Sequence, residues 1–329
     1  MFLPQLPRQR VAQASRVFDA FQMSQTELLS PAGDFETALA AFDAGADAVY
    51  CGLADFSARA FAKNLSFEDL GHLVRFAHAK GKKVYVTFNT LVDEVDVEQA
   101  VETLSRLEEI GPDALIVQDL GVARLCRRHF PALALHASTQ LVAHNLEGVL
   151  ALKDVGFTRV VLARELSLAE IASISKRCGG LELECFIHGA LCYSISGLCL
   201  FGAMEKGRSG NRGKCPYCCR MGYGQPVNPF IFSMKDLRLG ENVRKLVDAG
   251  VVSLKIEGRM KSALYVAAVT KFYRQIMGNG ERGTGRALRS PTSRPSSPAA
   301  RRSSISTARA RSRRSTPSRS GTSARPSEP

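Results

Sequence analysis

The sequence predicts an α/β fold, a (β/α) TIM-like barrel with a Cys-rich insertion loop after the seventh strand. Short apolar runs alternate with helical patterns from residue 27 to residue 277, which is typical of a parallel sheet. Seven or more such units without a G-x-G-x-x-G fingerprint favour a barrel over a dinucleotide-binding fold. Six of the nine cysteines lie within residues 185–219, and these locate the insertion.

Nine apolar or β-branched runs predict the strands. They are Glu27–Leu29, Ala48–Cys51, Lys83–Phe88, Ala114–Val117, Leu133–His136, Arg159–Ala163, Leu181–Ile187, Phe230–Ser233 and Val252–Ile256. The intervening segments show the helical period of 3.6. Their apolar stripes are Leu70, Leu73, Val74 and Ala77, and Val101, Leu104 and Leu107. Ser167 and Glu170 have capping-box spacing, and glycines at 45, 81, 111, 156 and 250 mark helix ends.

The barrel domain is predicted over residues 25–280, with a poorly ordered extension at 1–24. The tail, 281–329, holds 12 Arg, no Lys and 2 Glu, and its composition predicts disorder. The abrupt change after Gly280 is what a frameshift in GC-rich coding DNA would produce. Residues 1–280 hold 32 basic and 29 acidic side chains, so the net charge of +13 comes mainly from the tail and is weak support for nucleic-acid binding.

Neither a signal peptide nor an apolar run of transmembrane length is recognisable in the sequence. We therefore expect a cytoplasmic protein without a membrane partner. Cysteines stay reduced in that compartment and can act as metal ligands, which argues against disulfides.

Polar residues follow most of the predicted strands. In barrels the chemistry lies at the carboxyl ends of the strands, so these residues predict a lined pocket. The alternative is that most of them are caps and internal salt bridges. These polar residues include Asn89, Gln140, Arg164, Glu165, His188, Asp236, Glu257 and Arg259.

The cysteines predict a metal-binding loop at 188–220. Cys192, Cys199, Cys215, Cys218 and Cys219 sit among glycines in irregular sequence, whereas the other four cysteines are expected to be small buried hydrophobes. Zinc prefers two Cys-x-x-Cys pairs, and only the pair at 215 and 218 has that spacing. Iron–sulfur clusters accept wider spacing, so spacing leaves both metals open. A redox role for the Cys-x-x-Cys pair is a further alternative.

Motifs along nearly the whole ordered chain resemble those of the collagenase-like peptidase family U32. They are Glu27–Gly33, Gly45–Tyr50, His136–Gln140, Leu162–Leu166, Glu184–Cys192 with Tyr193–Cys199, Gly207–Gly213, Ser233–Leu237 and Lys255–Ser262. Many members of this family are oxygen-independent hydroxylases. Their products include 5-hydroxycytidine in ribosomal RNA, 5-hydroxyuridine in tRNA, and ubiquinone precursors.

The resemblance implies a 4Fe-4S cluster on Cys192, Cys199, Cys215 and Cys219. Cys219 is chosen over Cys218 because it directly precedes Arg220. The resemblance also implies prephenate as oxygen source in the RNA-modifying members, with an electron donor or a paired family member as further partners. The motifs Ala114–Asp119, His136–Gln140 and Gly207–Ser209 favour the ribosomal-RNA branch.

The first functional hypothesis is therefore an iron–sulfur-dependent RNA hydroxylase. His188, Glu165 and Glu257 are its candidate acid–base residues. Arg164, Lys255 and Arg259 are expected to hold the donor's carboxylates, and Asn89, Gln140 and Asp236 complete the predicted substrate site. The acidic residues could instead pair with these cations as structural bridges. Lys206–Arg208 and Arg212–Lys214 supply one basic patch for RNA.

Two alternatives remain open at this point. A peptidase would need a nucleophile, for which Cys192 with His188 is conceivable, although H-E-x-x-H and G-x-S-x-G motifs are absent from the sequence. A zinc-stabilised, non-catalytic barrel is the other. The metal that the protein holds discriminates between the second alternative and the hydroxylase.

Overall fold

The structure, a computed structural model, describes residues 23, 25–59, 62–224 and 227–278. All of them belong to one compact unit, Met1–Pro291. The predictions for the 1–24 extension and for the 281–329 tail lie outside the described residues, apart from Met23, which is buried. Among the described residues, no helix is both long and apolar enough to cross a membrane.

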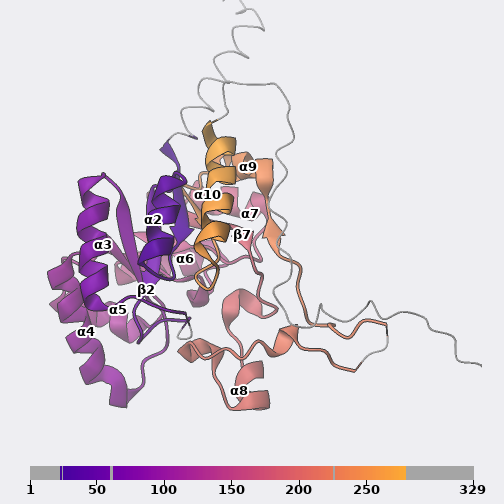
Figure 1. Ribbon diagram of the computed structural model, residues 1–329, viewed down its shortest axis with the longest axis horizontal. Helices are drawn as coiled ribbons and strands as arrows, with labels where there is room; N and C mark the ends of the chain where they lie inside the picture. Colours follow the sequence, from indigo (N-terminus) through magenta and orange to yellow (C-terminus); the bar gives the residue numbers. More distant parts are fainter. Residues whose placement is uncertain (1–22, 24, 60–61, 225–226, 279–329) are drawn as a thin grey trace, which may run out of the picture. The chain divides into compact units, whose positions relative to one another are not determined.

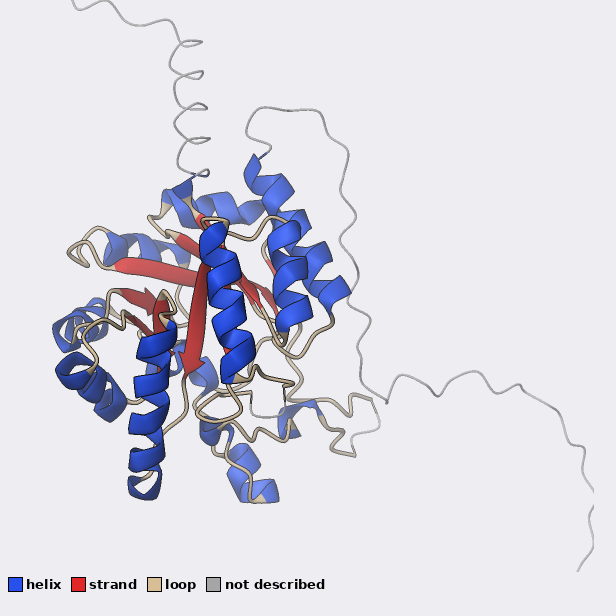
Figure 2. Cartoon of the chain, turned by 60° about the vertical axis from the view of Figure 1, so that its left-hand side comes forward, coloured by secondary structure: helices blue, strands red, loops and turns tan. Residues whose placement is uncertain are grey.

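Eight parallel strands close into a barrel, which confirms the predicted fold (Figure 2). Neighbouring strands follow the chain from β1 to β7, and β9 closes the ring between β7 and β1. They are β1 (Glu27–Pro31), β2 (Ala48–Gly52), β3 (Lys83–Phe88), β4 (Ala114–Val117), β5 (Leu135–Ala137), β6 (Arg159–Val161), β7 (Glu182–Gly189) and β9 (Ser253–Ile256). The two-residue strand β8 (Leu237–Arg238) pairs antiparallel with the end of β7.

The helices that connect these strands surround the barrel (Figure 1). They are α2 (Phe35–Asp43), α3 (Phe67–Ala79), α4 (Val97–Ile110), α5 (Leu120–His129), α6 (Leu146–Val155), α7 (Leu168–Ser175), α9 (Val243–Asp248) and α10 (Ala263–Gly278). The predicted capping box is present at α7, where Ser167 and Glu170 bond each other's backbone. Gly111 and Gly156 end α4 and α6 with φ of 70° and 106°, a conformation that glycine adopts without steric cost.

Two predicted features are wrong. Residues 230–233 form a turn rather than a strand, because Phe232 packs on Phe201 and Tyr223 of the neighbouring segments and not on the sheet. Val101 is 39% exposed, so it lies off the buried stripe of α4, which runs through Ala100, Thr103, Leu104 and Leu107.

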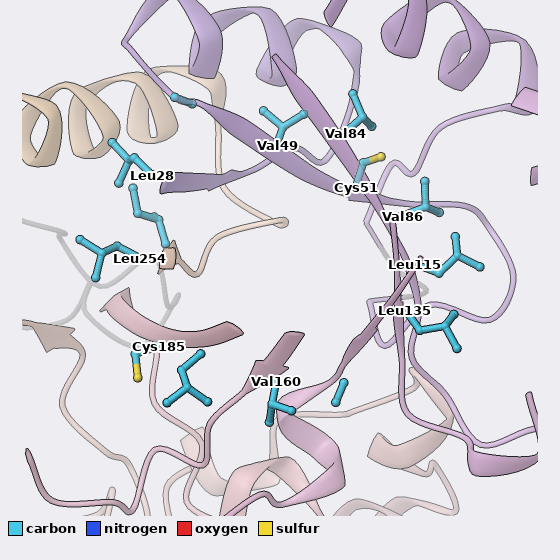
Figure 3. Close-up of a cluster of buried hydrophobic side chains, with 14 of the residues drawn as sticks. Leu28, Val49, Cys51, Val84, Val86, Leu115, Leu135, Val160, Cys185 and Leu254 are labelled. Atoms are coloured by element: carbon cyan, nitrogen blue, oxygen red, sulfur yellow. The ribbon is translucent and has the colours of Figure 1, made fainter. Parts of the chain in front are cut away.

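The apolar core has two layers. The larger lies between the barrel and its helices and contains Leu28, Val49, Val84 and Leu254 (Figure 3). The smaller fills the barrel interior with Leu29, Ala48, Tyr50, Tyr85, Ala114 and Ile116. Strand residues alternate between the two layers, as a period of two requires.

The cysteine lobe, residues 190–236, is inserted between β7 and β8 (Figure 1). Its described residues form one short helix, α8 (Phe201–Lys206), three single 3-10 turns and irregular loops. Cys218 is its only buried hydrophobic residue among those described. This lobe is therefore held by something other than an apolar core.

Candidate functional site

A cavity of about 1130 Å³ lies between the carboxyl ends of the barrel strands and the cysteine lobe. Eleven of the thirteen predicted site residues line it. They are Asn89, Gln140, Arg164, Glu165, Lys255, Glu257, Arg259, Cys192, Cys199, Cys215 and Cys219. The sequence therefore predicted most of the pocket lining, although His188 and Asp236 do not contribute to it.

A buried ionic network forms the floor of the cavity. Glu184 lies inside the barrel, where its carboxylate accepts from Lys255 Nζ at 2.7 Å and from Arg159 Nη1 at 3.3 Å. Burial opposes ionisation of Glu184, but the charges of Lys255 and Arg159 lower its pKa to about 2. The charge of Lys255 is thus already matched by a protein carboxylate, which weakens its predicted role as an anion ligand.

Glu257 is the carboxylate that faces the cavity. Its Oε1 accepts from Arg59 Nη2 at 2.9 Å, and its Oε2 lies 3.1 Å from the Tyr50 hydroxyl. Burial opposes ionisation, but the charges of Arg59, Arg164 and Arg259 lower the pKa of Glu257 to about 2. Such a carboxylate is a weak proton acceptor near neutral pH. The geometry of Glu257 therefore matches a structural salt bridge, which was the alternative to its predicted acid–base role.

Arg259 is buried without a carboxylate partner among the described residues. Its Nη1 donates to Ser57 Oγ at 2.6 Å and to Thr87 Oγ1 at 2.8 Å. Burial and the neighbouring charge of Arg59 lower the pKa of Arg259 to about 10. A Cβ on Gly52 would lie 2.4 Å from Nη1, so glycine is needed there to admit the guanidinium.

Arg164 is the third guanidinium on the cavity wall. It stacks over the Phe186 ring at 4.1 Å, and its Nη1 donates to Ala190 O at 3.2 Å. Its Nε is buried and has no hydrogen-bond partner in the described part of the chain. With Arg59 and Arg259, it gives the cavity three guanidinium groups from the barrel, and Arg220 and Lys255 add two further cations to a lining whose carboxylates are Glu165 and Glu257. The lining is complementary to an anion.

Two predicted amide residues lie together on the wall. Asn89 Nδ2 donates to Gln140 Oε1 at 3.3 Å, and Asn89 Oδ1 accepts from the backbone of Ala58 at 3.0 Å. The first bond orients the Gln140 amide. The pair can donate to and accept from an uncharged polar group of a ligand.

Glu165 connects the barrel to the cysteine lobe. Its two oxygens accept from the backbone and the hydroxyl of Ser196 at 2.8 and 2.7 Å. Burial raises the pKa of Glu165, but the hydrogen bonds from Ser196 outweigh it and the pKa is lowered. Glu165 lines the cavity, but both of its carboxylate oxygens already accept hydrogen bonds from Ser196 of the lobe.

A β-bulge carries His188 away from the cavity. Glu184 and Phe186 face the barrel interior, and strict alternation would place His188 there too. The pairing of β7 with β9 shifts between Phe186 and His188, so His188 instead contacts α10. Its Nδ1 lies 3.2 Å from the Tyr273 hydroxyl, and burial lowers its pKa to about 4.

Asp236 lies at the edge of the lobe, outside the cavity. Its side chain is 38% exposed and is 3.9 Å from Arg220 Nη2. Arg220 also donates to Leu191 O at 2.8 Å and to Ser233 Oγ at 2.9 Å, so it joins three loops of the lobe. Arg220 therefore holds the lobe together and also lines the cavity, whereas Asp236 does not line it.

All five cysteines of the lobe line the cavity. Cys192 is exposed, Cys218 is buried, and the other three are partly exposed. Burial raises the pKa of both Cys215 and Cys219, and the charges of Cys192 and Cys199 raise each further. Burial also opposes ionisation of Cys199, but hydrogen bonds from Ser194 and from backbone amides lower its pKa. The thiols are therefore close enough to affect one another.

The thiols of the lobe suit either a zinc ion or an iron–sulfur cluster, because the donor set is sulfur alone. In the described ranges no three His, Cys, Asp or Glu side chains converge on one ion position. The donor chemistry is therefore compatible with the cluster that the motifs imply, and the identity of the metal stays a prediction.

The motif at residues 207–213 ties the lobe to the rim of the barrel. Arg212 pairs with Asp96 at 2.7 Å and also with Asp93, both of which follow β3. Asn211 O accepts from the backbone of Leu91 at 3.2 Å, and Asn211 Oδ1 accepts from the backbone of Cys199 at the same distance. The motif thus positions one of the predicted ligand cysteines directly.

Arg59 and Tyr50 are the site residues that the sequence analysis missed. Tyr50 lies inside a strand that reads as core, and only its hydroxyl contacts Glu257. Arg59 lies in a loop after β2 without periodicity or motif. The only available signal was their position after or near the end of a barrel strand, where polar groups gather.

The fold and the site define a TIM barrel whose arginine-rich mouth is covered by a thiol-bearing lobe. The chain belongs to peptidase family U32, whose sequence model matches residues 33–307. This confirms the family that the motifs indicated. The U32 peptidase Mk0906 has the same fold, with a TM-score of 0.50 and 13% identity over 71% of this chain and 93% of that one.

Several characterised relatives match the same part of the chain. The 23S rRNA 5-hydroxycytidine C2501 synthase of Escherichia coli is 45% identical over 76% of this chain and 39% of its own length. A tRNA hydroxylation protein P of Helicobacter pylori is 38% identical over 77% and 64%. A collagenase of Porphyromonas gingivalis is 34% identical over 76% and 65%. The chain therefore spans less than two thirds of the length of these relatives.

Proposed function

We propose that this protein is an RNA base hydroxylase that uses an iron–sulfur cluster and an anionic, prephenate-like oxygen donor. The observation that carries the proposal is the cavity, whose lining combines the guanidinium groups of Arg59, Arg164 and Arg259 with the cysteines of the lobe. Two relatives with related sequences are named for hydroxylated cytidine in 23S rRNA and for tRNA hydroxylation. The substrate is ribosomal RNA cytidine or tRNA uridine, in a cytoplasmic setting.

The arginines have the arrangement that a dicarboxylate donor needs. Arg259 is rigidly held by Ser57 and Thr87, and Arg164 has a buried, unpartnered Nε. Guanidinium groups bind carboxylates through strong charge-assisted hydrogen bonds. Glu257 fixes Arg59 in place and limits the excess of positive charge. The Asn89–Gln140 pair is positioned to orient an uncharged polar group of the base or of the donor.

Cys192, Cys199, Cys215 and Cys219 would hold a 4Fe-4S cluster, which would supply electron transfer or substrate activation when bound. An electron donor or a paired family member would serve it. The role of the chain is to close the cavity with the lobe, hold the anion and exclude water. None of the three predicted acid–base residues is free to act as a neutral-pH base in this geometry, because Glu165 and Glu257 are ion-paired or hydrogen-bonded and His188 faces α10.

Peptidase activity receives less support, although one relative is a collagenase. The conceivable pair of Cys192 and His188 requires a hydrogen bond between nucleophile and base. His188 is instead bound to Tyr273 and lies outside the cavity that Cys192 lines. The zinc-stabilised, non-catalytic barrel stays an alternative that the metal content tests.

Metal content provides the first test. Protein purified without oxygen is expected to contain about four irons and four acid-labile sulfides per chain, and Cys192→Ala is expected to lose them. Cys126→Ala is the matched control, because Cys126 is buried in the barrel core away from the lobe. Zinc in place of iron, or iron that survives Cys192→Ala, would contradict the cluster.

The activity is tested on nucleosides. RNA from a strain that lacks the gene is expected to lose 5-hydroxycytidine in 23S rRNA or 5-hydroxyuridine in tRNA, measured by mass spectrometry. The wild-type gene should restore the nucleoside, whereas an Arg259→Met gene should not, because the anion site is then incomplete. Unchanged levels of both nucleosides in the deletion strain would contradict the proposed RNA hydroxylase activity.

A further inference from the structure

The cysteine lobe presents an unusual surface. Of the 19 large hydrophobic side chains that are exposed among the described residues, 11 belong to this lobe. They are Tyr193, Ile195, Leu198, Leu200, Met204, Tyr217, Met221, Val227, Phe230, Ile231 and Met234. Exposed apolar side chains gathered on one segment are typical of an interaction site.

Part of this surface forms the rim of the cavity. Tyr193, Ile195, Leu198, Leu200 and Tyr217 line the cavity and are also between 42% and 68% exposed to solvent. Beneath them, Phe232 packs against Tyr193, Phe201 and Tyr223 with ring centroids 5.2 to 5.6 Å apart. The packing supports the rim from below. A ligand that enters the cavity therefore passes over apolar and aromatic side chains.

The charge of the lobe differs from that of the rest of the body. The lobe holds six basic and two acidic side chains, whereas the remainder of residues 1–280 holds 26 basic and 27 acidic ones. Lys206 ends α8 and Lys214 precedes the cavity-lining Cys215, and both are exposed. The lobe, which carries most of the exposed apolar groups, thus has a net positive charge, whereas the rest of residues 1–280 is nearly neutral.

We propose that the cysteine lobe is a docking surface for unpaired nucleotides, in which the rim stacks bases that flank the target and Lys206 and Lys214 contact their phosphates. This inference rests on the proposed function and deepens it. Apolar and aromatic side chains with basic neighbours are what single-stranded nucleic acid requires, since every base has a face that stacks and every linkage has a negative charge. A base inside a duplex could not reach the cavity, so the substrate nucleotide is unpaired or flipped out.

The test measures binding of a fluorescent 15-nucleotide single-stranded RNA by anisotropy at several salt concentrations. Lys206→Glu with Lys214→Glu is expected to weaken binding at least tenfold. It should also reduce the steepness of the salt dependence by about 1.4, the value for two lost phosphate contacts on a single strand. The matched control is Lys176→Glu with Lys271→Glu, an equal change of charge on exposed residues of the barrel helices, and it should leave both quantities nearly unchanged.

Stacking is tested separately. Tyr193→Leu keeps an apolar side chain against Phe232 but removes the aromatic face, and it should weaken binding about fivefold or more without changing the salt dependence. Leu200→Ser offers a second rim variant that does not touch the Phe232 cluster. The same RNA annealed to its complement should bind the wild type more weakly than the single strand does.

Failure of the docking surface and failure of the proposed hydroxylase activity give different results. If the wild type binds the single strand and the lobe variants do not, but no nucleoside changes in the deletion strain, the docking surface stands and the hydroxylase proposal falls. If the deletion strain loses its nucleoside while the lobe variants bind RNA like the wild type, the docking surface falls. Equal effects of the two lysine pairs, or equal binding of duplex and single strand, would also overturn it.

Discussion

The barrel and the cysteine lobe are stabilised in different ways although they form one cavity. The barrel buries apolar side chains on both sides of its sheet, in layers between strands and helices and inside the ring. The lobe buries one hydrophobic residue, Cys218, among those described. It is connected to the rim by Arg212 with Asp96 and by Ser196 with Glu165. A segment of this size without a core needs cross-links, and metal–thiolate bonds supply them in many small domains.

The barrel, which is the framework of the site, follows the pattern of apolar burial, whereas the lobe that carries the thiols does not. Strands such as β3 and β4 bury nearly every side chain, so their apolar and β-branched runs predicted their ends correctly. In the lobe, apolar residues do not mark burial. Residues 230–233 therefore suggested a strand, although Phe232 packs on Tyr223 and Phe201 in a turn.

The largest expected effect is on the ionic floor of the barrel. Glu184→Gln leaves Lys255 and Arg159 buried with reduced compensation, so we expect a loss of about 3 to 5 kcal/mol in the free energy of unfolding. Urea unfolding monitored by circular dichroism measures it. A Glu205→Gln variant, on the exposed surface of α8, serves as the control. A loss below about 1 kcal/mol would mean that the network contributes little to the barrel.

A pair of apolar truncations separates the two regions directly. Leu104→Ala removes a fully buried side chain of α4 and should cost about 2 to 5 kcal/mol. Met204→Ala removes an 83% exposed side chain of α8 and should stay within about 0.5 kcal/mol. Both are read from the urea midpoint of the same transition. If the two variants lost similar free energies of unfolding, the barrel and the lobe would not differ in how apolar side chains stabilise them.

Acid should weaken the barrel through its buried carboxylates. Glu184 and Glu257 have pKa values near 2 in the folded protein, below the unfolded value of about 4.3, so their stabilisation is present above that value. It is lost as pH falls from about 4 towards 2. Urea midpoints at pH 7, 5, 4 and 3 should decline mainly in the last steps. In Glu184→Gln the decline should be shallower, and an unchanged slope would contradict the assignment.

The smallest effect concerns the attachment of the lobe. Ser196→Ala removes the hydroxyl that donates to Glu165 at 2.7 Å, which should cost about 1 to 2 kcal/mol in closure of the lobe. Limited proteolysis should therefore cut residues 190–224 several times faster, while the urea midpoint of the barrel stays nearly constant. Ser173→Ala, on the exposed face of α7, is the control. Cleavage at the wild-type rate would show that the hydrogen bond between Ser196 and Glu165 is not needed to hold the lobe closed.

The site residues that follow a strand or lie in a motif were predictable from the sequence. Gln140, Arg164 and Arg259 follow barrel strands, and the pocket contains them. Arg59 was not predictable, because a loop residue several positions beyond β2 has no periodicity to place it. His188 was misplaced for a different reason, since alternation along β7 holds only up to the bulge after Phe186.

That bulge has a consequence for how such sites diverge. One extra residue in β7, relative to β9, decides whether the imidazole of His188 faces α10 or the ligand. One residue added to β9 opposite Ile187 would remove the bulge, so the alternation along β7 would continue and His188 would face inward. In this barrel, a change in the length of a strand can therefore add or remove a titratable group from the pocket while every side chain is retained.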